Sequence, residues 1–194
     1  ELTPASVNPG MPSARTQAGW QEDTAVKRYG ALFAGVDAFF PAVRRKGPAR
    51  YVVSAERDGR LCDVLKESYE VERIFEGADA AMEAAVGFEG QLDVLTATPD
   101  CKFVSTATPV RATTPAAKAR EEAARAARAS EDLMAAAAAI RMMCERARPK
   151  VVMVEQAVGL MTHHKLLYAA FNEELRRIDG HGYHWQGRAT LMCR

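Results

Sequence analysis

Short apolar runs alternate with helix-favouring stretches along most of the chain. The runs predict strands over residues 29–35, 49–56, 69–77, 91–97 and 150–155. The strand at 69–77 is weaker, and those at 91–97 and 150–155 have the length and content of buried strands. Helical patterns lie between and after them, near residues 37–46, 58–68, 79–88, 116–147 and 164–180. This alternation predicts an α/β fold, doubly wound, with a mostly parallel sheet that is covered on both faces.

Two stretches differ from this alternation. Residues 1–24 are rich in Pro, Gly, Ser, Thr and Ala without a sustained period, and we expect them to form a mobile lead-in. Residues 116–147 are dominated by Ala, Arg and Glu, and their first half has no apolar stripe wide enough for a core. We therefore expect a solvated helical insertion inside a single domain that spans residues 25–194.

Candidate binding and catalytic residues stand at or just beyond the ends of four predicted strands. They are Gly35, Glu56, Cys101 and Glu155. In open α/β sheets, ligands bind outside the carboxyl ends of the strands. A glycine there admits a ligand close to the backbone, and an acid about 20 residues later suits ribose hydroxyls. An ordinary turn glycine, solvated carboxylates and an inert buried cysteine remain alternatives.

Composition narrows the classes of partner. With 26 basic and 25 acidic side chains the net charge is +1, which excludes a strongly basic nucleic-acid surface. No apolar run approaches the roughly 18 residues of a membrane span. The four cysteines form no CxxC pair, and His163 and His164 have no partner at metal spacing. We expect no membrane and no metal, and the cysteine usage favours a reducing compartment.

Four motifs together resemble a known family. They are "LFAG" at 32–35, "SAER" with Glu56, "TPDCKFVS" at 98–105 and "VEQAVGL" at 154–160. In this order they resemble the catalytic core of the DNA (cytosine-5)-methyltransferases, from residue 29 to about 190. The resemblance implies the Rossmann-like fold of S-adenosylmethionine-dependent methyltransferases, incomplete at its C-terminus. The chain departs from the family pattern at Asp37 for Gly, Asp100 for Pro, Lys102 for Gln, Gln156 for Asn and Ala157 for Val.

The resemblance also implies roles for individual residues. The cofactor S-adenosylmethionine would be held by Phe33, Gly35, Glu56, Asp79 and Pro99. Within this set, Glu56 corresponds to the acid that binds the ribose hydroxyls, and Asp79 to the acid that meets the adenine amino group. In the family a thiolate adds to carbon 6 of a cytosine that has left the DNA stack, which makes carbon 5 nucleophilic. Cys101 corresponds to that thiolate, and Glu155 to the acid at ring nitrogen 3.

The departures from the family affect the expected activity. Asp100 places a carboxylate beside the thiol and should raise its pKa, and Asp37 adds negative charge near the cofactor motif. Residues 102–115 have the length and polarity of a loop that closes over a flipped base. A tRNA cytosine-5 methyltransferase and a degenerate, non-catalytic domain remain alternatives. We interpret the chain as a piece of a longer protein and expect these 194 residues alone to transfer no methyl groups.

Overall fold

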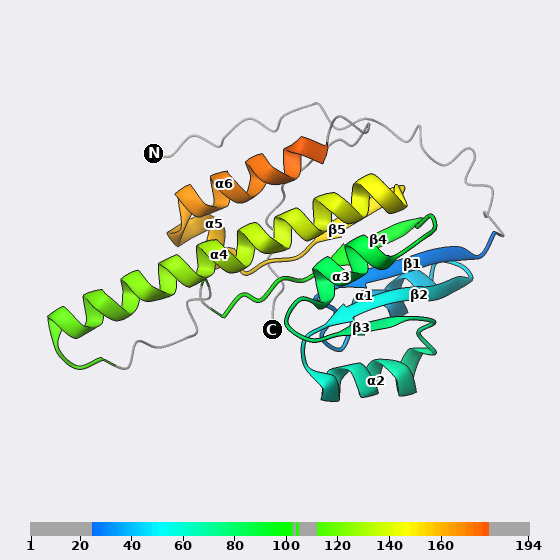
Figure 1. Ribbon diagram of the computed structural model, residues 1–194, viewed down its shortest axis with the longest axis horizontal. Helices are drawn as coiled ribbons and strands as arrows, with labels where there is room; N and C mark the ends of the chain where they lie inside the picture. The colour runs from blue at the N-terminus through cyan, green and yellow to red at the C-terminus, as the bar shows by residue number, and fades with distance from the viewer. Residues whose placement is uncertain (1–24, 103, 105–111, 179–194) are drawn as a thin grey trace, which may run out of the picture.

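The computed structural model describes residues 25–102, 104 and 112–178 (Figure 1). The predicted lead-in at 1–24 lies outside the described residues, as does most of the predicted closing loop at 102–115. Within the described part, five strands form one parallel sheet in the order β3-β2-β1-β4-β5. Their bounds are β1 Lys27–Leu32, β2 Ala49–Glu56, β3 Ile74–Glu76, β4 Val94–Ala97 and β5 Val151–Val154.

This sheet confirms the predicted α/β fold with its parallel order. The arrangement 3-2-1-4-5 is the order of Rossmann-like proteins, in which the chain moves outward from a central strand and then returns to its other side. The weak strand predicted at 69–77 is reduced to β3, because Tyr69 ends the preceding helix and Glu70 has a left-handed backbone with φ +52°. The other strands lie within two to three residues of their predicted bounds.

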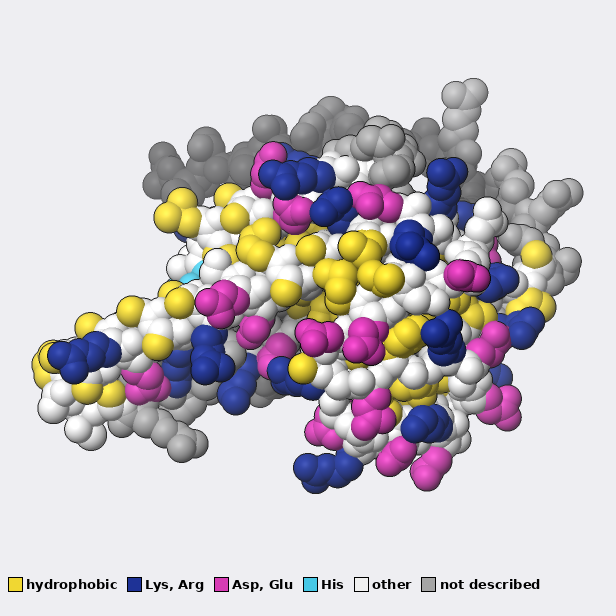
Figure 2. Space-filling view, viewed as in Figure 1, with side chains coloured by type: hydrophobic (Ala, Val, Ile, Leu, Met, Phe, Trp, Pro, Cys, Tyr) yellow, Lys and Arg dark blue, Asp and Glu magenta, His cyan; other side chains and the backbone are white. Residues whose placement is uncertain are grey.

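Helices cover both faces of the sheet. One face carries α1 (Phe39–Arg44) and α2 (Gly59–Tyr69), which pack around an aromatic cluster. The other face carries α3 (Ala80–Gly87) and α4 (Pro115–Ala147), and Figure 1 shows α6 (Lys165–Arg176) lying along α4. The short α5 (Val158–His163) joins β5 to α6. Basic and acidic side chains are interspersed on the face shown in Figure 2, in keeping with the near-zero net charge.

The long helix α4 differs from the predicted solvated insertion in its second half. Its first half, up to residue 128, is exposed and extends beyond the sheet in Figure 1. Its second half is core, where Leu133, Ile140 and Met143 are almost completely buried. Small side chains on α4 meet the alanines of α3, so the two helices approach closely. The expectation of a solvated helix is therefore wrong for residues 129–147, which belong to the crossover between β4 and β5.

Substitution in the two halves of α4 should distinguish core from exposed helix. We expect Leu133→Ala to lower the free energy of unfolding by about 2–5 kcal/mol, because it removes buried methyl groups and leaves a cavity. The matched change Lys118→Ala, on the exposed half, should alter it by less than about 0.5 kcal/mol. Urea unfolding monitored by circular dichroism measures both. Equal effects would contradict the burial of the second half.

Candidate functional site

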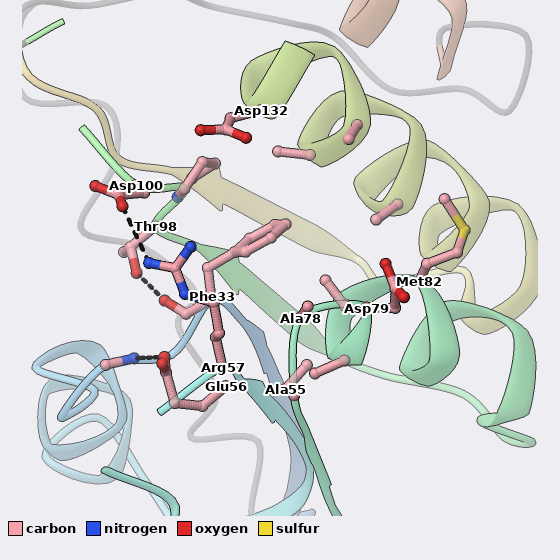
Figure 3. Close-up of a pocket in the computed structure, with 18 of the residues that line it drawn as sticks. Phe33, Ala55, Glu56, Arg57, Ala78, Asp79, Met82, Thr98, Asp100 and Asp132 are labelled. Carbon is pink, nitrogen blue, oxygen red and sulfur yellow. Dashed lines mark hydrogen bonds and ion pairs between the residues drawn. The ribbon is translucent and has the colours of Figure 1, made fainter. Parts of the chain in front are cut away.

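A cavity of about 550 Å³ opens at the carboxyl ends of the central strands. The chain leaves β1 toward β2 on one side, and it returns to β4 on the other side of β1. The loops after β1 and β4 therefore diverge, and a crevice forms between them, which is where ligands bind in such folds. Phe33 and Gly35 follow β1, Thr98 and Pro99 follow β4, and all four line the cavity (Figure 3).

The structure brings together the residues that the resemblance assigned to the cofactor. The lining of this cavity includes Phe33, Gly35, Glu56, Asp79 and Pro99. They come from the ends of β1, β2 and β4 and from the start of α3, so they span 67 positions of the sequence from Phe33 to Pro99. Their convergence on one cavity makes a shared ligand physically possible.

Glu56 links the two strand ends at the floor of the site. Its Oε2 accepts a hydrogen bond from the Gly35 backbone N–H at 2.7 Å, and its Oε1 accepts one from Asp58 N at 2.9 Å. Gly35 has a left-handed φ of +56°, which favours glycine at this turn. Each carboxylate oxygen keeps a second lone pair. Glu56 can therefore hold the loop after β1 and still accept hydrogen bonds from ligand hydroxyls.

Carboxylates dominate the charged lining. Asp79 stands at the first position before α3, but its side chain makes no capping hydrogen bond there. Asp132 lines the cavity from α4, and Figure 3 places it on the opposite side from Glu56. Together with Asp100 these acids face a single lining cation, Arg57, among the residues described. A ligand with positive charge is favoured by this balance.

Sequence reasoning missed Asp132 and Arg57. Asp132 lies in the middle of a helix for which the sequence predicts solvent exposure, and no motif surrounds it. Arg57 directly follows Glu56, so its place next to a candidate binding residue was the available signal. Thr98, within a motif that was recognised, donates from its hydroxyl to the Phe33 carbonyl and ties the loops after β1 and β4 together.

Cys101 and Glu155 lie outside this lining but at the same edge of the sheet. The Glu155 backbone N–H donates to the Ala97 carbonyl at 2.9 Å, which continues the pairing of β5 with β4. Cys101 follows β4 on an exposed loop. Partial burial of the thiol raises the pKa of Cys101, and the negative charges of Glu155 and then Asp100 raise it further. The predicted effect of Asp100 is thus confirmed in direction.

The loop that carries Cys101 is also held from β5. The Gln156 side-chain amide donates to the Pro99 carbonyl at 3.2 Å, and its Oε1 accepts from Ala157 N at 2.8 Å. Gln156 stands where the family pattern has Asn, so an amide group is retained on a side chain one methylene longer. The loops after β4 and β5 are therefore fixed to each other next to the cavity.

Asp37 is a buried carboxylate in the turn that follows β1. It is 3% exposed, and its Oδ1 accepts hydrogen bonds from the Tyr29 hydroxyl at 2.8 Å and from the backbone N–H groups of Phe39 and Phe40. Asp37 has a left-handed φ of +45°, and the two backbone hydrogen bonds that it accepts hold the start of α1. Burial raises the pKa of Tyr29, and the charge of Asp37 adds to this shift. Asp37 is not among the residues that line the cavity, and the effect of its charge on a bound cofactor stays a prediction.

The described residues contain no group of three or more His, Cys, Asp or Glu side chains that could hold a metal ion. None of the helices described has the length and apolar content needed to cross a membrane. Neither the protein-family models nor the curated proteins with which the sequence was compared match it. Fold and cavity thus define a class, a Rossmann-like α/β protein with a candidate ligand site at the switch point of its sheet.

Proposed function

We propose that the cavity binds S-adenosylmethionine and that the protein methylates carbon 5 of cytosine in DNA. One observation carries the proposal: the five residues that the family resemblance assigns to the cofactor line a single cavity at the switch point of the sheet. The thiol and the carboxylate assigned to catalysis, on Cys101 and Glu155, lie at the adjacent strand ends and interact electrostatically.

The cavity suits this cofactor in size and charge. Its volume of about 550 Å³ falls within the roughly 300–1,000 Å³ of small-molecule sites. Glu56 offers acceptors for ribose hydroxyls, and Phe33 and Met82 offer apolar surface for an adenine ring. The surplus of lining carboxylates favours a sulfonium and an ammonium group. When bound, S-adenosylmethionine supplies an electrophilic methyl group.

The chain's own residues would act on the cytosine. The Cys101 thiolate forms a bond from Sγ to carbon 6, and the electron pair of the ring double bond moves toward carbon 5. Glu155 holds a proton at ring nitrogen 3 and so draws electrons from carbon 6. Once carbon 5 carries its methyl group, its proton leaves to solvent, the Sγ–carbon bond breaks and the double bond returns. The thiolate is then restored.

One observation favours a second candidate, a cofactor-binding domain without catalysis. Partial burial, Glu155 and Asp100 all raise the pKa of Cys101. The thiolate is the reactive form of cysteine, so these effects lower the reactive fraction at neutral pH. A domain that retained the cavity but lost its nucleophile would still bind S-adenosylmethionine. Binding and methyl transfer must therefore be measured separately.

Labelled methyl transfer tests the proposal. We expect the protein as it is encoded, with any sequence that flanks these residues, to move labelled methyl groups from S-adenosylmethionine to cytosine carbon 5 in double-stranded DNA. Incorporation into tRNA alone would replace the DNA assignment. Calorimetric binding of S-adenosylhomocysteine without incorporation into either nucleic acid would support the non-catalytic domain. Absence of cofactor binding would contradict the proposal as a whole.

A further inference from the structure

A single carboxylate connects the cavity with the turn that carries Cys101. Asp100 Oδ2 lies 3.2 Å from Arg57 Nη2, and Asp100 Oδ1 accepts a hydrogen bond from the Lys102 backbone N–H at 2.8 Å. The second bond spans Cys101, and the Val104 N–H donates to the Cys101 carbonyl at 3.1 Å. Asp100 therefore shapes the turn around the thiol with one oxygen and binds Arg57 with the other.

Arg57 brings this link to the ligand side of the site. It directly follows Glu56, whose carboxylate holds Gly35, and both Arg57 and Asp100 line the cavity. Figure 3 shows their ion pair between the end of β2 and the loop after β4, which lie on opposite sides of β1 in the chain's path. A ligand seated on Glu56 would lie next to the guanidinium. Binding of such a ligand would therefore alter the ion pair between Arg57 and Asp100.

The ion pair between Arg57 and Asp100 also affects the ionisation of the Cys101 thiol. Glu155 at the end of β5 and Asp100 on its own loop both disfavour the thiolate. The guanidinium of Arg57 partly neutralises Asp100 across the ion pair. The side chains of Arg57 and Asp100 are 69% and 38% exposed, so the pair contributes little to global stability. Its influence should be local, on the position and ionisation of the thiol.

We propose that Arg57 is a positioning residue for Cys101, that it acts through Asp100, and that it couples occupancy of the cavity to the reactivity of the thiol. The coupling rests on the proposed function of the cavity as a cofactor site. The positional part does not depend on it, because the ion pair and the hydrogen bond of the turn involve only residues of the chain. The two parts can therefore be tested apart.

The positional part is tested by alkylation with iodoacetamide across the neutral to alkaline pH range, with peptide mapping to follow Cys101. We expect Arg57→Gln to move the midpoint of the pH profile upward and to slow alkylation at neutral pH by about threefold, since the guanidinium no longer offsets the charge of Asp100, while the neighbouring Lys102 is the same in both proteins. Asp100→Asn should move the midpoint downward. In the Asp100→Asn background, Arg57→Gln should have no further effect, because its partner charge is gone.

Arg60→Gln is the matched control. It removes the same charge three residues along the chain, but the Arg60 side chain is 93% exposed and lies near Asp58 instead of Asp100. A shift for Arg57→Gln no larger than that for Arg60→Gln would overturn the positional role. Mapping separates Cys101 from the buried thiols of Cys62 and Cys144.

The coupling is tested with S-adenosylhomocysteine as the probe. We expect a saturating amount of this probe to change the rate of Cys101 alkylation in the wild type. In the Arg57→Gln variant, the rate should not change, although calorimetry shows that the variant has bound the probe. Equal changes in both proteins would overturn the coupling. Failure of the wild type to bind the probe would refute the cofactor proposal and the coupling together. The pH shift in the ligand-free protein would still decide the role of Arg57.

Discussion

Replacement of Cys101 by Ser should abolish covalent capture of DNA that contains 5-fluorocytosine. On the proposed mechanism, the wild type would form the Sγ–carbon 6 bond and methylate the ring, but fluorine cannot leave carbon 5 as a proton does, so elimination would stall. A serine hydroxyl stays protonated at neutral pH and is a far weaker nucleophile than a thiolate. We expect the adduct to fall by at least about 100-fold. Denaturing electrophoresis with cofactor and the encoded protein measures it.

Cys62→Ser provides the matched control for this capture. The Cys62 thiol is buried on α2 and donates to the Glu56 carbonyl at 3.6 Å, and burial is the main cause of its raised pKa. The control should retain the adduct. An adduct mapped to Cys62, Cys144 or Cys193 instead of Cys101 would refute the assignment of the nucleophile.

Capture should also depend on pH in a defined direction. Partial burial, Glu155 and Asp100 raise the pKa of Cys101, so the thiolate fraction at neutral pH is smaller than for an ordinary thiol. The rate of capture should therefore rise with pH until the raised pKa is passed. A rate that is already maximal at neutral pH would show that bound DNA or cofactor lowers the pKa of the thiol.

The three central strands, β1, β2 and β4, were predictable because most of their residues are buried in the sheet. β2 and β4 read as continuous hydrophobic segments, and pairing in parallel follows from the helices between them. β3 was uncertain in extent, since only three of its residues pair with β2 and its burial is partial. The edge of a sheet imposes weaker requirements on sequence than its centre does. The other edge strand, β5, was nevertheless predicted to within one residue at each end, so its place at the edge does not by itself explain the shortened β3.

The burial of the second half of α4 could not be predicted, because this half is rich in alanine. Alanine favours a helix in water and in a core alike, so a run of alanines shows the helix but not its environment. Burial of residues such as Ala136 and Ala139 depends on the close approach of α3, which is itself rich in alanine. That contact joins segments about 50 residues apart in the sequence. Periodicity within one segment cannot reveal it.

In the candidate site, too, some features could be predicted from the sequence and others could not. Placement of Glu56 and Cys101 at one edge follows from strand order, because parallel strands end on the same side. The contacts of Asp100 with Arg57 and the burial of Asp37 do not follow from order, since they depend on turn geometry and on side-chain directions. The residues that modify the chemistry were thus harder to predict than the residues that would perform it.

Glu56 gives the largest expected effect on cofactor binding. We expect Glu56→Ala to weaken the binding of S-adenosylhomocysteine by about 1.5–3 kcal/mol, or roughly 10- to 150-fold, because charge-assisted hydrogen bonds to the ribose hydroxyls are lost. The change also removes the acceptor of the Gly35 N–H, so the loop after β1 loses one of its hydrogen bonds to β2, while the bond from the Ala34 N–H to the Ala55 carbonyl remains. Glu56→Gln keeps one acceptor oxygen and the side-chain volume. Its loss of affinity should therefore be smaller than that of Glu56→Ala.

Glu76→Ala is the matched control for the binding measurement. Glu76 ends β3 in register with Glu56 on the neighbouring strand, but it does not line the cavity. Calorimetry with S-adenosylhomocysteine should give the wild-type affinity for Glu76→Ala, and urea unfolding of each variant shows whether the fold is retained. Equal affinities for the wild type and Glu56→Ala would remove Glu56 from the site. An equal loss in both variants would mean that the negative field of the strand ends, and not a contact with the ribose, holds the ligand.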